Sequence, residues 1–452
     1  MKKKLVVIGA GSAMFTQGLI ADLLNQLPGG HTWAVALCDI VPETLKGIEF
    51  LVKKMAAAKN VCLDVTSSTN RCDLLPDADY VVSTIGVGGR RSWEQDVFIP
   101  RKYGIFQPVG DTAMPGGLSR AMRMVPAMID IVNDVKKLAP SAMFFNYSNP
   151  MSIILRALAK TVDFPVTGLC MGTVGSQDYI ADTMGYDRSC FTTLAAGINH
   201  CTFIYDFRYE GKCVKNEIRQ KIETVYVDGF DSKMIDRFHG EKEIELMLSE
   251  PFSWFFFLNN GSFPAPGDRH VSEFFTEFFP GGAYYGKKLG VDAYPFEGVI
   301  AYGDAIHNKA METAHSLDPL PGDFFTKFGG EHEQLIDIID SIERDRRDVY
   351  YINNPNRGAI PGLPYDAVVE MPATATALGL MPLYMDTFPV ELRSHTNRFL
   401  AGIELAAEAA LRGDRRLLEE AILAGGYITD RGAVTKMTEE LLTAQKTHLP
   451  QF

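Results

Sequence analysis

Short runs of β-branched and other apolar residues alternate with longer amphipathic stretches over the first 170 residues. Apolar runs without polar interruption are typical of strands covered on both faces, and strands that alternate with helices build a parallel sheet. The chain is therefore predicted to begin with an α/β unit, a doubly wound parallel sheet. The predicted strands are Leu5–Ile8, Trp33–Cys38, Val61–Val65, Tyr80–Ile85, Ala142–Tyr147 and Val166–Leu169, and the predicted helices are Thr16–Leu24, Glu43–Lys59 and Leu118–Leu138.

The hydrophobic pattern changes near residue 195, where a hairpin is predicted and helical periodicity follows. Residues 251–286 are rich in Phe, Gly and Pro and too long for a plain connection, and such segments tend to carry functional sites. The other predicted elements are the hairpin of Thr202–Tyr209 with Lys212–Glu217 and helices at Lys233–Leu248, Glu331–Arg347, Leu392–Leu411 and Leu417–Leu442. We therefore predict two domains, residues 1–195 with the parallel sheet and residues 196–452 as an α+β domain.

The charge balance excludes some classes of partner. The 452 residues carry 44 Lys and Arg against 56 Asp and Glu, and the net charge is -12. Counterion release from a nucleic acid therefore gives little driving force, and nucleic-acid binding is not expected. The seven cysteines include no C-x-x-C pair, which is usual for reduced thiols. No apolar run reaches the roughly 18 residues that span a bilayer. A cytoplasmic protein without membrane partners is predicted.

A glycine-rich loop, Gly9-Ala-Gly-Ser12, follows the first predicted strand and opens the first predicted helix. In this place the absent side chains let the backbone approach a pyrophosphate at the helix N-terminus. Asp39 ends the second strand, where a carboxylate accepts hydrogen bonds from ribose hydroxyls and repels a 2′-phosphate, which favours NAD over NADP. Met14 stands where a third glycine is usual. The alternative is a tight turn with Asp39 as a helix cap.

A second glycine-rich loop, residues 84–89, follows the fourth predicted strand. The carboxyl ends of parallel strands meet at one edge of the sheet, where ligands of such sheets bind. The two loops together predict a Rossmann-type NAD-binding domain. Its predicted cofactor contacts here are Gly9, Gly11, Ser12, Met14, Phe15, Asp39, Thr84 and Gly86.

Several further segments lie at strand ends or in irregular chain and are rich in groups that bind or react. In chain order they are Gly110–Gly117 with Arg120 and Arg123, Asn146–Pro150, Gly168–Cys170, Gly197–His200, Pro264–His270, Asn356–Pro364 and Val368–Pro372. Together with the start Val-Ile-Gly-Ala-Gly-Ser-Ala-Met-Phe, their joint order resembles glycoside hydrolase family 4, the NAD- and metal-dependent glycosidases. The resemblance spans nearly the whole chain and is nearest to the hexuronidase-like members and their NAD-dependent sulfoquinovosidase relatives.

The resemblance implies a hydrolysis without net redox change. NAD would take a hydride from C3 of the sugar, the resulting ketone would acidify the C2 proton for removal by a base, and the C1 substituent would be eliminated before water adds and the hydride returns. A divalent metal, Mn²⁺ by resemblance, would stabilise charge on the C2 and C3 oxygens. Its protein ligands would be Cys170 and His200. Without the resemblance, a buried thiol and a capping or core histidine are the alternatives.

The resemblance also gives roles to two polar residues near strand ends. Asn149 matches an asparagine that contacts substrate hydroxyls and the nicotinamide region, so it is predicted in both the cofactor and the substrate sites. Asp111 matches an acidic residue near the sugar and is a catalytic candidate. An ordinary Asn-Pro turn and an Asx-type helix cap are the alternatives for these two residues.

The chain departs from the family pattern at two places. Met171 follows the predicted metal-binding cysteine where most relatives have His, Asn or Asp, and a thioether cannot donate a proton to the leaving group. Where several relatives use a tyrosine as base, this chain has Asp268-Arg-His270. Asp268 is the first candidate for the C2 base and His270 the second, while an Asp268–Arg269 ion pair that braces the loop is the alternative. Further candidates for the base are Tyr284, Tyr285 and Tyr302.

Arg90, Arg91 and Arg269 are the predicted contacts of an acidic sugar substituent, and Met171 lies in the same predicted pocket. For Arg90 and Arg91 a solvated charge pair is the alternative. The predicted function is an NAD-dependent glycosidase for small α-glycosides of an anionic sugar. Met171 favours a sulfoquinovoside over a hexuronide, because typical uronidases have histidine there. The alternatives are a conventional NAD-dependent 2-hydroxyacid-type dehydrogenase and a redox-sensing NAD-binding regulator. The resemblance implies a homodimer or homotetramer.

Overall fold

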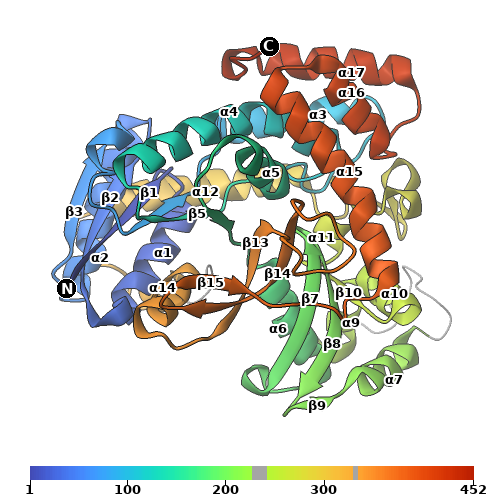
Figure 1. The fold of residues 1–452 in the computed structure, drawn as a ribbon, viewed down its shortest axis with the longest axis horizontal. Helices are drawn as coiled ribbons and strands as arrows, with labels where there is room; N and C mark the ends of the chain where they lie inside the picture. Colours follow the sequence, from blue (N-terminus) through green and yellow to red (C-terminus); the bar gives the residue numbers. More distant parts are fainter. Residues whose placement is uncertain (227–241, 329–333) are drawn as a thin grey trace.

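The computed structural model describes residues 1–226, 242–328 and 334–452, and within them one thirteen-stranded sheet forms the centre of the molecule (Figure 1). Its main path runs in the order β10-β8-β7-β14-β13-β6-β5-β4-β1-β2-β3, while β9 pairs with β8 and β15 with β14. The half from β3 to β6 is parallel, and the half from β13 to β10 is antiparallel.

The parallel half has the strand order 3-2-1-4-5-6 of a dinucleotide-binding domain. This order confirms the predicted fold class. Five strands match the predicted apolar runs closely, but β3 begins three residues later than predicted, because Val61 N donates to Ala56 O and still belongs to the turn that leaves the preceding helix. The strands are β1 Lys2–Ile8, β2 Thr32–Cys38, β3 Asp64–Ser68, β4 Tyr80–Ser83, β5 Met143–Asn146 and β6 Val166–Gly168.

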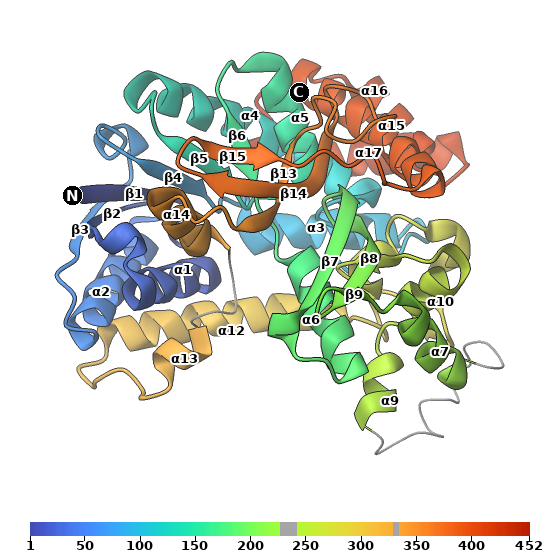
Figure 2. The ribbon, with the colours of Figure 1, turned by 60° about the horizontal axis from the view of Figure 1, so that its bottom comes forward.

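Helices cover both faces of the parallel half. One face packs on α1, α2, α12 and α14, and the other packs on α4, α5 and the C-terminal helices α15 to α17 (Figure 2). The three predicted helices correspond to α1 Ala13–Gln26, α2 Pro42–Ala58 and α4 Met114–Leu138. The sequence patterns missed α3 Gly89–Arg101, α5 Met151–Thr161, α6 Gly172–Met184 and α12 Phe296–His315. The first three of these begin at or just after loops that are predicted to belong to the site, where the residue types do not show a helical period.

The antiparallel half continues the same sheet. Its strands are β7 Phe191–Ile198, β8 Cys201–Tyr209, β9 Lys212–Cys213, β10 Phe263–Ala265, β13 Val349–Pro355, β14 Val368–Thr376 and β15 Gly379–Pro382. The predicted hairpin is present, but its second strand is only β9, because α7 Lys215–Val225 takes up the rest of that segment. The predicted domain boundary at residue 195 falls inside β7.

The C-terminal region is helical as predicted, with one correction. The single helix predicted over residues 417–442 is two, because Gly425 and Gly426 interrupt it and Asp430 caps a new start by accepting from the Gly432 and Ala433 amides. The helices are α15 Val390–Arg412, α16 Arg415–Ala424 and α17 Arg431–Ala444. Within the described residues, no helix is both long enough and apolar enough to cross a membrane.

The segment at 251–286 is less irregular than its composition suggests. It contains α10 Pro251–Asn260, β10 and the short helix α11 Asp268–Val271. In the aromatic run of α10, Trp254, Phe256 and Phe257 are buried in the core and Phe255 is exposed. The helices predicted at 233–248 and 331–347 lie partly outside the described residues, and their described parts are α9 Lys242–Met247 and α14 Leu335–Arg344.

One line of paired residues crosses eight neighbouring strands of the described sheet. The residues on this line, from β2 to β7, are Cys38, Ile8, Ser83, Asn146, Gly168, Asn353, Glu370 and Gly197. The chain leaves the parallel strands β2, β1, β4, β5 and β6 within one residue of this line. The line therefore sets the level at which the loops after these strands begin.

A buried ion pair ties α3 and the second glycine-rich loop to α4. Arg123 Nη2 lies 2.5 Å from Asp96 Oδ2 with both side chains almost fully buried, and Arg123 Nε donates to Val87 O at 2.8 Å. We expect Arg123→Met to lose about 3 to 5 kcal/mol of stability, because Asp96 would stay as an uncompensated buried charge. Chemical denaturation measures the loss. Arg431→Ala removes an exposed ion pair with Glu420 and should change the free energy of unfolding by less than about 1 kcal/mol. Equal losses of stability in Arg123→Met and Arg431→Ala would contradict this account.

Candidate active site

The first glycine-rich loop is tied to the end of β2. The Gly9 and Ala10 amides donate to Cys38 O at 2.9 and 3.0 Å, and Gly9 has φ +89°, which favours glycine. The Gly11 amide donates to Asp39 Oδ2 at 2.7 Å, and a Cβ at Gly11 would lie 2.6 Å from that oxygen. Asp39 Oδ1 accepts from the Val41 amide at 3.0 Å, before α2 begins. Asp39 thus shapes both turns beside the loop.

The start of α1 can receive an anion. No side chain caps its first turn, which also lacks an acidic residue, so its orphan amides stay available to a phosphate. Met14 is 36% exposed, and the Phe15 ring packs on Tyr147 at 5.8 Å between centroids. The second glycine-rich loop adjoins this start, because Thr84 Oγ1 donates to Gly9 O at 2.9 Å. The two glycine-rich loops therefore lie side by side at the carboxyl ends of β1 and β4.

His200 occupies the turn between β7 and β8 in a strained conformation. Its φ is +64°, which is uncommon for a residue with a Cβ and is typical of functional sites. Its Nδ1 lies 2.6 Å from Thr112 Oγ1, which lies 2.6 Å from Asp111 Oδ1. Asn149 Nδ2 donates to Asp111 Oδ2 at 3.1 Å. The structure thus brings three of the predicted residues, Asp111, Asn149 and His200, into one hydrogen-bonded group.

The charges in this group act on one another. Burial opposes ionisation of Asp111, but the positive charges of His200 and Arg120 dominate and lower its pKa. Burial lowers the pKa of His200. The His270 ring lies 4.4 Å from the His200 ring between centroids, and burial together with His200 holds the pKa of His270 well below its usual value. The pKa values of Asp111, His200 and His270 are therefore all lowered within this group.

Cys170 lies between β6 and α6, where the Gly172 amide donates to its Sγ at 3.3 Å. A negatively charged sulfur is stabilised at a helix N-terminus. A Cβ at Gly172 would lie 2.7 Å from Pro266 Cβ, so this turn packs closely on the segment that leads to His270. In the parts of the chain that are described, no three His, Cys, Asp or Glu side chains are arranged to hold a metal. No described side chain of these types therefore extends the predicted ligand pair of Cys170 and His200 to a group of three.

Asp268, the first candidate for the base, lies within a buried hydrogen-bond network. Its oxygens accept from the Phe252 and Ser253 amides at 2.7 Å each, from Ser253 Oγ at 2.6 Å and from the Tyr284 hydroxyl at 2.7 Å. These amides belong to the first turn of α10, so Asp268 caps that helix. The alternative weighed for Asp268, an ion pair with Arg269, is not formed among the described side chains. Burial raises the pKa of Asp268.

The arginines predicted for the substrate have different surroundings. Arg90 Nε and Arg91 Nη2 each lie 2.5 Å from the carboxylate of Asp304 on α12, and Arg91 also pairs with Glu94. Their contacts fit the solvated charge pairs that were the alternative. Arg269 is half-buried, and its charge adds to the effect of burial in lowering the pKa of His200 and of His270. Its Nε is buried without a hydrogen-bond partner in the described chain. Met171 immediately precedes α6.

Sequence reasoning gave no role to three residues of the site. Thr112 and Arg120 stand inside the motif at 110–123, but spacing alone shows no partner for them. Arg120 Nε donates to Asn149 O at 3.1 Å, and its guanidinium lies 5.6 Å from the Trp93 ring centroid. Glu273, just after His270, accepts from the Val109 and Gly110 amides at 2.8 Å each and so holds the turn before Asp111.

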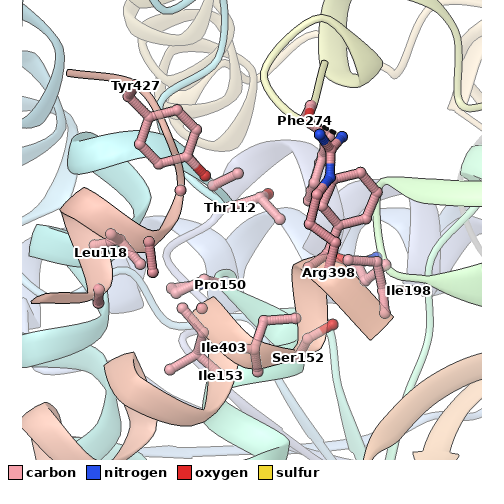
Figure 3. A pocket seen from close by; sticks show the side chains of 17 residues that line it. Thr112, Leu118, Pro150, Ser152, Ile153, Ile198, Phe274, Arg398, Ile403 and Tyr427 are labelled. Carbon is pink, nitrogen blue, oxygen red and sulfur yellow. Dashed lines mark hydrogen bonds between the residues drawn. The ribbon is translucent and has the colours of Figure 1, made fainter. Parts of the chain in front are cut away.

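A cavity of about 60 Å³ lies directly behind this group (Figure 3). Thr112, Pro150 and Asn199 line it on the side of the site, and side chains from α5, α15 and α16 line the rest. The Ser152 hydroxyl is buried beside it without a hydrogen-bond partner in the described residues. The volume has room for roughly four water molecules. The cavity therefore lies against Thr112, next to Asp111 in the chain.

Comparison with known proteins shows the family. Residues 4–186 match the model described as family 4 glycosyl hydrolase, and residues 195–425 match the model of the family 4 glycosyl hydrolase C-terminal domain. The chain belongs to glycosyl hydrolase family 4. The predicted resemblance is confirmed, and with it the prediction of a glycoside hydrolase.

Two relatives match nearly the whole chain. It is 27% identical to an alpha-galactosidase of Rhizobium meliloti (strain 1021), covering 99% of this chain and 89% of that protein. It is 28% identical to an alpha-galacturonidase of Thermoanaerobacterium saccharolyticum, covering 98% and 95%.

Two solved structures have a fold similar to that of this chain. A 6-phospho-alpha-glucosidase from gut microorganisms, in complex with NAD and Mn²⁺, aligns over 100% of both chains with TM-score 0.83 and 18% identity. Malate dehydrogenase from Plasmodium falciparum aligns over 92% of this chain and 99% of that one with TM-score 0.51 and 14% identity. The likeness to malate dehydrogenase shows a shared fold alone, and the family match does not favour the alternative of a dehydrogenase.

Glu273 should make the stability of this family 4 chain depend on pH. Burial raises the pKa of Glu273 to about 8 from its ordinary 4.5. The folded chain therefore binds this proton more tightly than the unfolded chain, and the stability it contributes is full below pH 4.5 and lost as pH rises through about 8.

Glu273→Gln keeps an acceptor for the Val109 and Gly110 amides but cannot ionise. Between pH of about 5 and about 9, we expect its melting temperature to fall less than that of the wild-type protein. Thermal melts across this range measure the difference, with exposed Glu277→Gln as the control that should follow the wild type. Parallel curves for Glu273→Gln and the wild type would contradict the raised pKa.

Proposed function

We propose that this family 4 chain is an NAD-dependent glycosidase for small α-glycosides of an anionic sugar. The observation that carries the proposal is the common level of the predicted residues in the sheet. Asp39, Gly9, Thr84, Asn149, Cys170 and His200 each follow a residue of the eight-strand line by one to three positions. Because β7 runs antiparallel to β6, His200 leaves this line on the opposite side, and its contact with Thr112 joins it to Asp111 and Asn149 at the edge of the parallel strands.

The residues present fit both cofactors. Asp39 at the end of β2 and the uncapped start of α1 suit a ribose and a pyrophosphate. Cys170 Sγ and His200 suit a transition metal such as Mn²⁺ that keeps open positions for sugar oxygens and water. NAD when bound would supply reversible hydride transfer at C3, and the metal would supply Lewis acidity at the C2 and C3 oxygens.

The chain's own residues divide the remaining work. Asn149, fixed by Asp111 and Arg120, would orient the sugar hydroxyls. The base that removes the C2 proton is proposed to be His270, because it is the titratable side chain of its segment that lies against His200. Asp268 has its oxygens occupied by the start of α10, and we propose a supporting role for it.

The acidic substituent of the substrate is proposed to bind Arg269. This guanidinium lies beside the two imidazoles and forms no ion pair with a described carboxylate, whereas Arg90 and Arg91 already pair with Asp304. A hexuronide is the first substrate to test, since alpha-galacturonidases are among the relatives, and a sulfoquinovoside is the second, since Met171 departs from the uronidase pattern. The cytoplasmic location and the homodimer or homotetramer stay predictions.

Turnover of aryl α-glycosides in deuterated water tests the proposal. Galacturonides, glucuronides and sulfoquinovosides are compared, each with and without NAD and Mn²⁺. We expect aglycone release that needs both cofactors, no accumulation of NADH, and deuterium at C2 of the product. Cys170→Ser should lose at least roughly 100-fold in kcat/KM, and Cys213→Ser, at an exposed thiol, should not. Release that persists after removal of all cofactor would contradict the mechanism.

The assignment of the base has a separate test. His270→Asn should lose C2 deuterium exchange and roughly 100-fold or more in kcat while keeping NAD and Mn²⁺ binding, because general bases contribute on this scale. Asp268→Asn should instead lower the melting temperature, because the start of α10 loses its anionic cap. Loss of exchange in Asp268→Asn at an unchanged melting temperature would assign the base to Asp268.

A further inference from the structure

The hydroxyl of Thr112 lies between a carboxylate and an imidazole. Thr112 Oγ1 is 2.6 Å from Asp111 Oδ1 and 2.6 Å from His200 Nδ1. A hydroxyl has one proton to donate, so Thr112 can donate in only one of these two short contacts. The direction of these two hydrogen bonds therefore decides whether Nδ1 of His200 carries a hydrogen.

The contacts of Asp111 fix that direction. Its other oxygen, Oδ2, receives a hydrogen bond from Asn149 Nδ2 at 3.1 Å, and an amide NH₂ group only donates. Oδ1 in turn accepts from Thr112 Oγ1 at 2.6 Å, so both oxygens of Asp111 act as acceptors, as in an ionised carboxylate. Thr112 must then donate to Asp111 and accept from the remaining partner. The remaining partner is His200, whose Nδ1 must carry the hydrogen.

We propose that Asp111 and Thr112 are positioning residues that hold His200 in the tautomer with hydrogen on Nδ1 and so present Nε2 as the metal-binding nitrogen. The inference rests on the proposed function, which makes His200 a ligand, and adds the ring nitrogen and the two residues that select it. A histidine ligand whose second nitrogen donates to an anchored acceptor has a fixed orientation and higher basicity.

The local backbone supports a ring held in one orientation. His200 adopts φ +64° in the β7–β8 turn, and its ring is confined between Thr112 and the edge of the His270 ring at 4.4 Å. Glu273 anchors the turn before Asp111 through two backbone amides. Both ends of the Asp111–Thr112–His200 chain are therefore supported by groups outside it.

Metal affinity gives the first test. Thr112→Val removes the hydroxyl at nearly constant volume, and Thr112→Ser keeps it. With NAD present, titration of Mn²⁺ followed by the magnetic resonance signal of the free ion should show about 10- to 100-fold weaker binding in Thr112→Val and near-wild-type binding in Thr112→Ser. NAD affinity should stay unchanged in both. The control is Thr183→Val, a buried threonine in α6 whose hydroxyl donates to Tyr179 O.

The tautomer itself gives the second test, and it needs no metal. In protein labelled with ¹⁵N histidine, with the His200 signals assigned through His200→Gln, the neutral ring should carry hydrogen on Nδ1 in the wild type. The Nε2–H tautomer in the wild type, or Mn²⁺ affinity unchanged in Thr112→Val, would overturn the inference. Failure of the metal assignment looks different, because Mn²⁺ would then bind Cys170→Ser and the wild type alike.

Discussion

The pairing of one residue per strand across eight strands is the constraint on which the rest of the structure depends. Because backbone hydrogen bonds fix this register, the chain leaves each strand of the parallel half at nearly the same level. A slip of one residue in any of these strands would turn its side chains to the other face of the sheet and move its loop out of line. The residues of the site lie mainly in the loops that follow this register. The apolar packing on both faces of the sheet holds the register for them.

Acidic side chains near the site hold the backbone of neighbouring turns and helix starts. Asp39 accepts from the Gly11 amide, Glu273 accepts from the amides before Asp111, and Asp268 accepts from the first turn of α10. Each is an acidic side chain whose oxygens accept from orphan amides at a turn or a helix start, where such donors are most costly to bury unpaired. This explains why so many acidic side chains lie near a site proposed for an anionic sugar. Their oxygens accept from backbone donors, and the positive charges in the site are those of Arg120, which acts on Asp111, and Arg269, which acts on His200.

The sequence predicted the parts of the fold that local pattern determines. Unbroken apolar runs gave five strands of the parallel half closely, and the residue types after them identified Gly9, Asp39 and Thr84. The rest depends on contacts between distant segments. The Asp304 partner of Arg90 lies on α12, more than 200 positions away, and the helix that Asp268 caps precedes it in the chain. Thr112 shows no signal of its own, since its role exists only where the β7–β8 turn meets it. Strands β13 and β14 were not predicted from the sequence.

The continuity of the sheet also explains why the second half of the chain is indispensable to the first. Strand β6 would be an open edge without β13, and an unpaired edge favours association with other chains. The face formed by α4 and α5 would expose a large apolar surface without α15 to α17, which share its core. The strand order of the parallel half does not by itself supply His200, because the β7–β8 turn that carries this proposed ligand is held in the sheet by the pairing of β7 with β14. The pairing of β7 with β14 that continues the sheet therefore also brings in the β7–β8 turn, which carries His200.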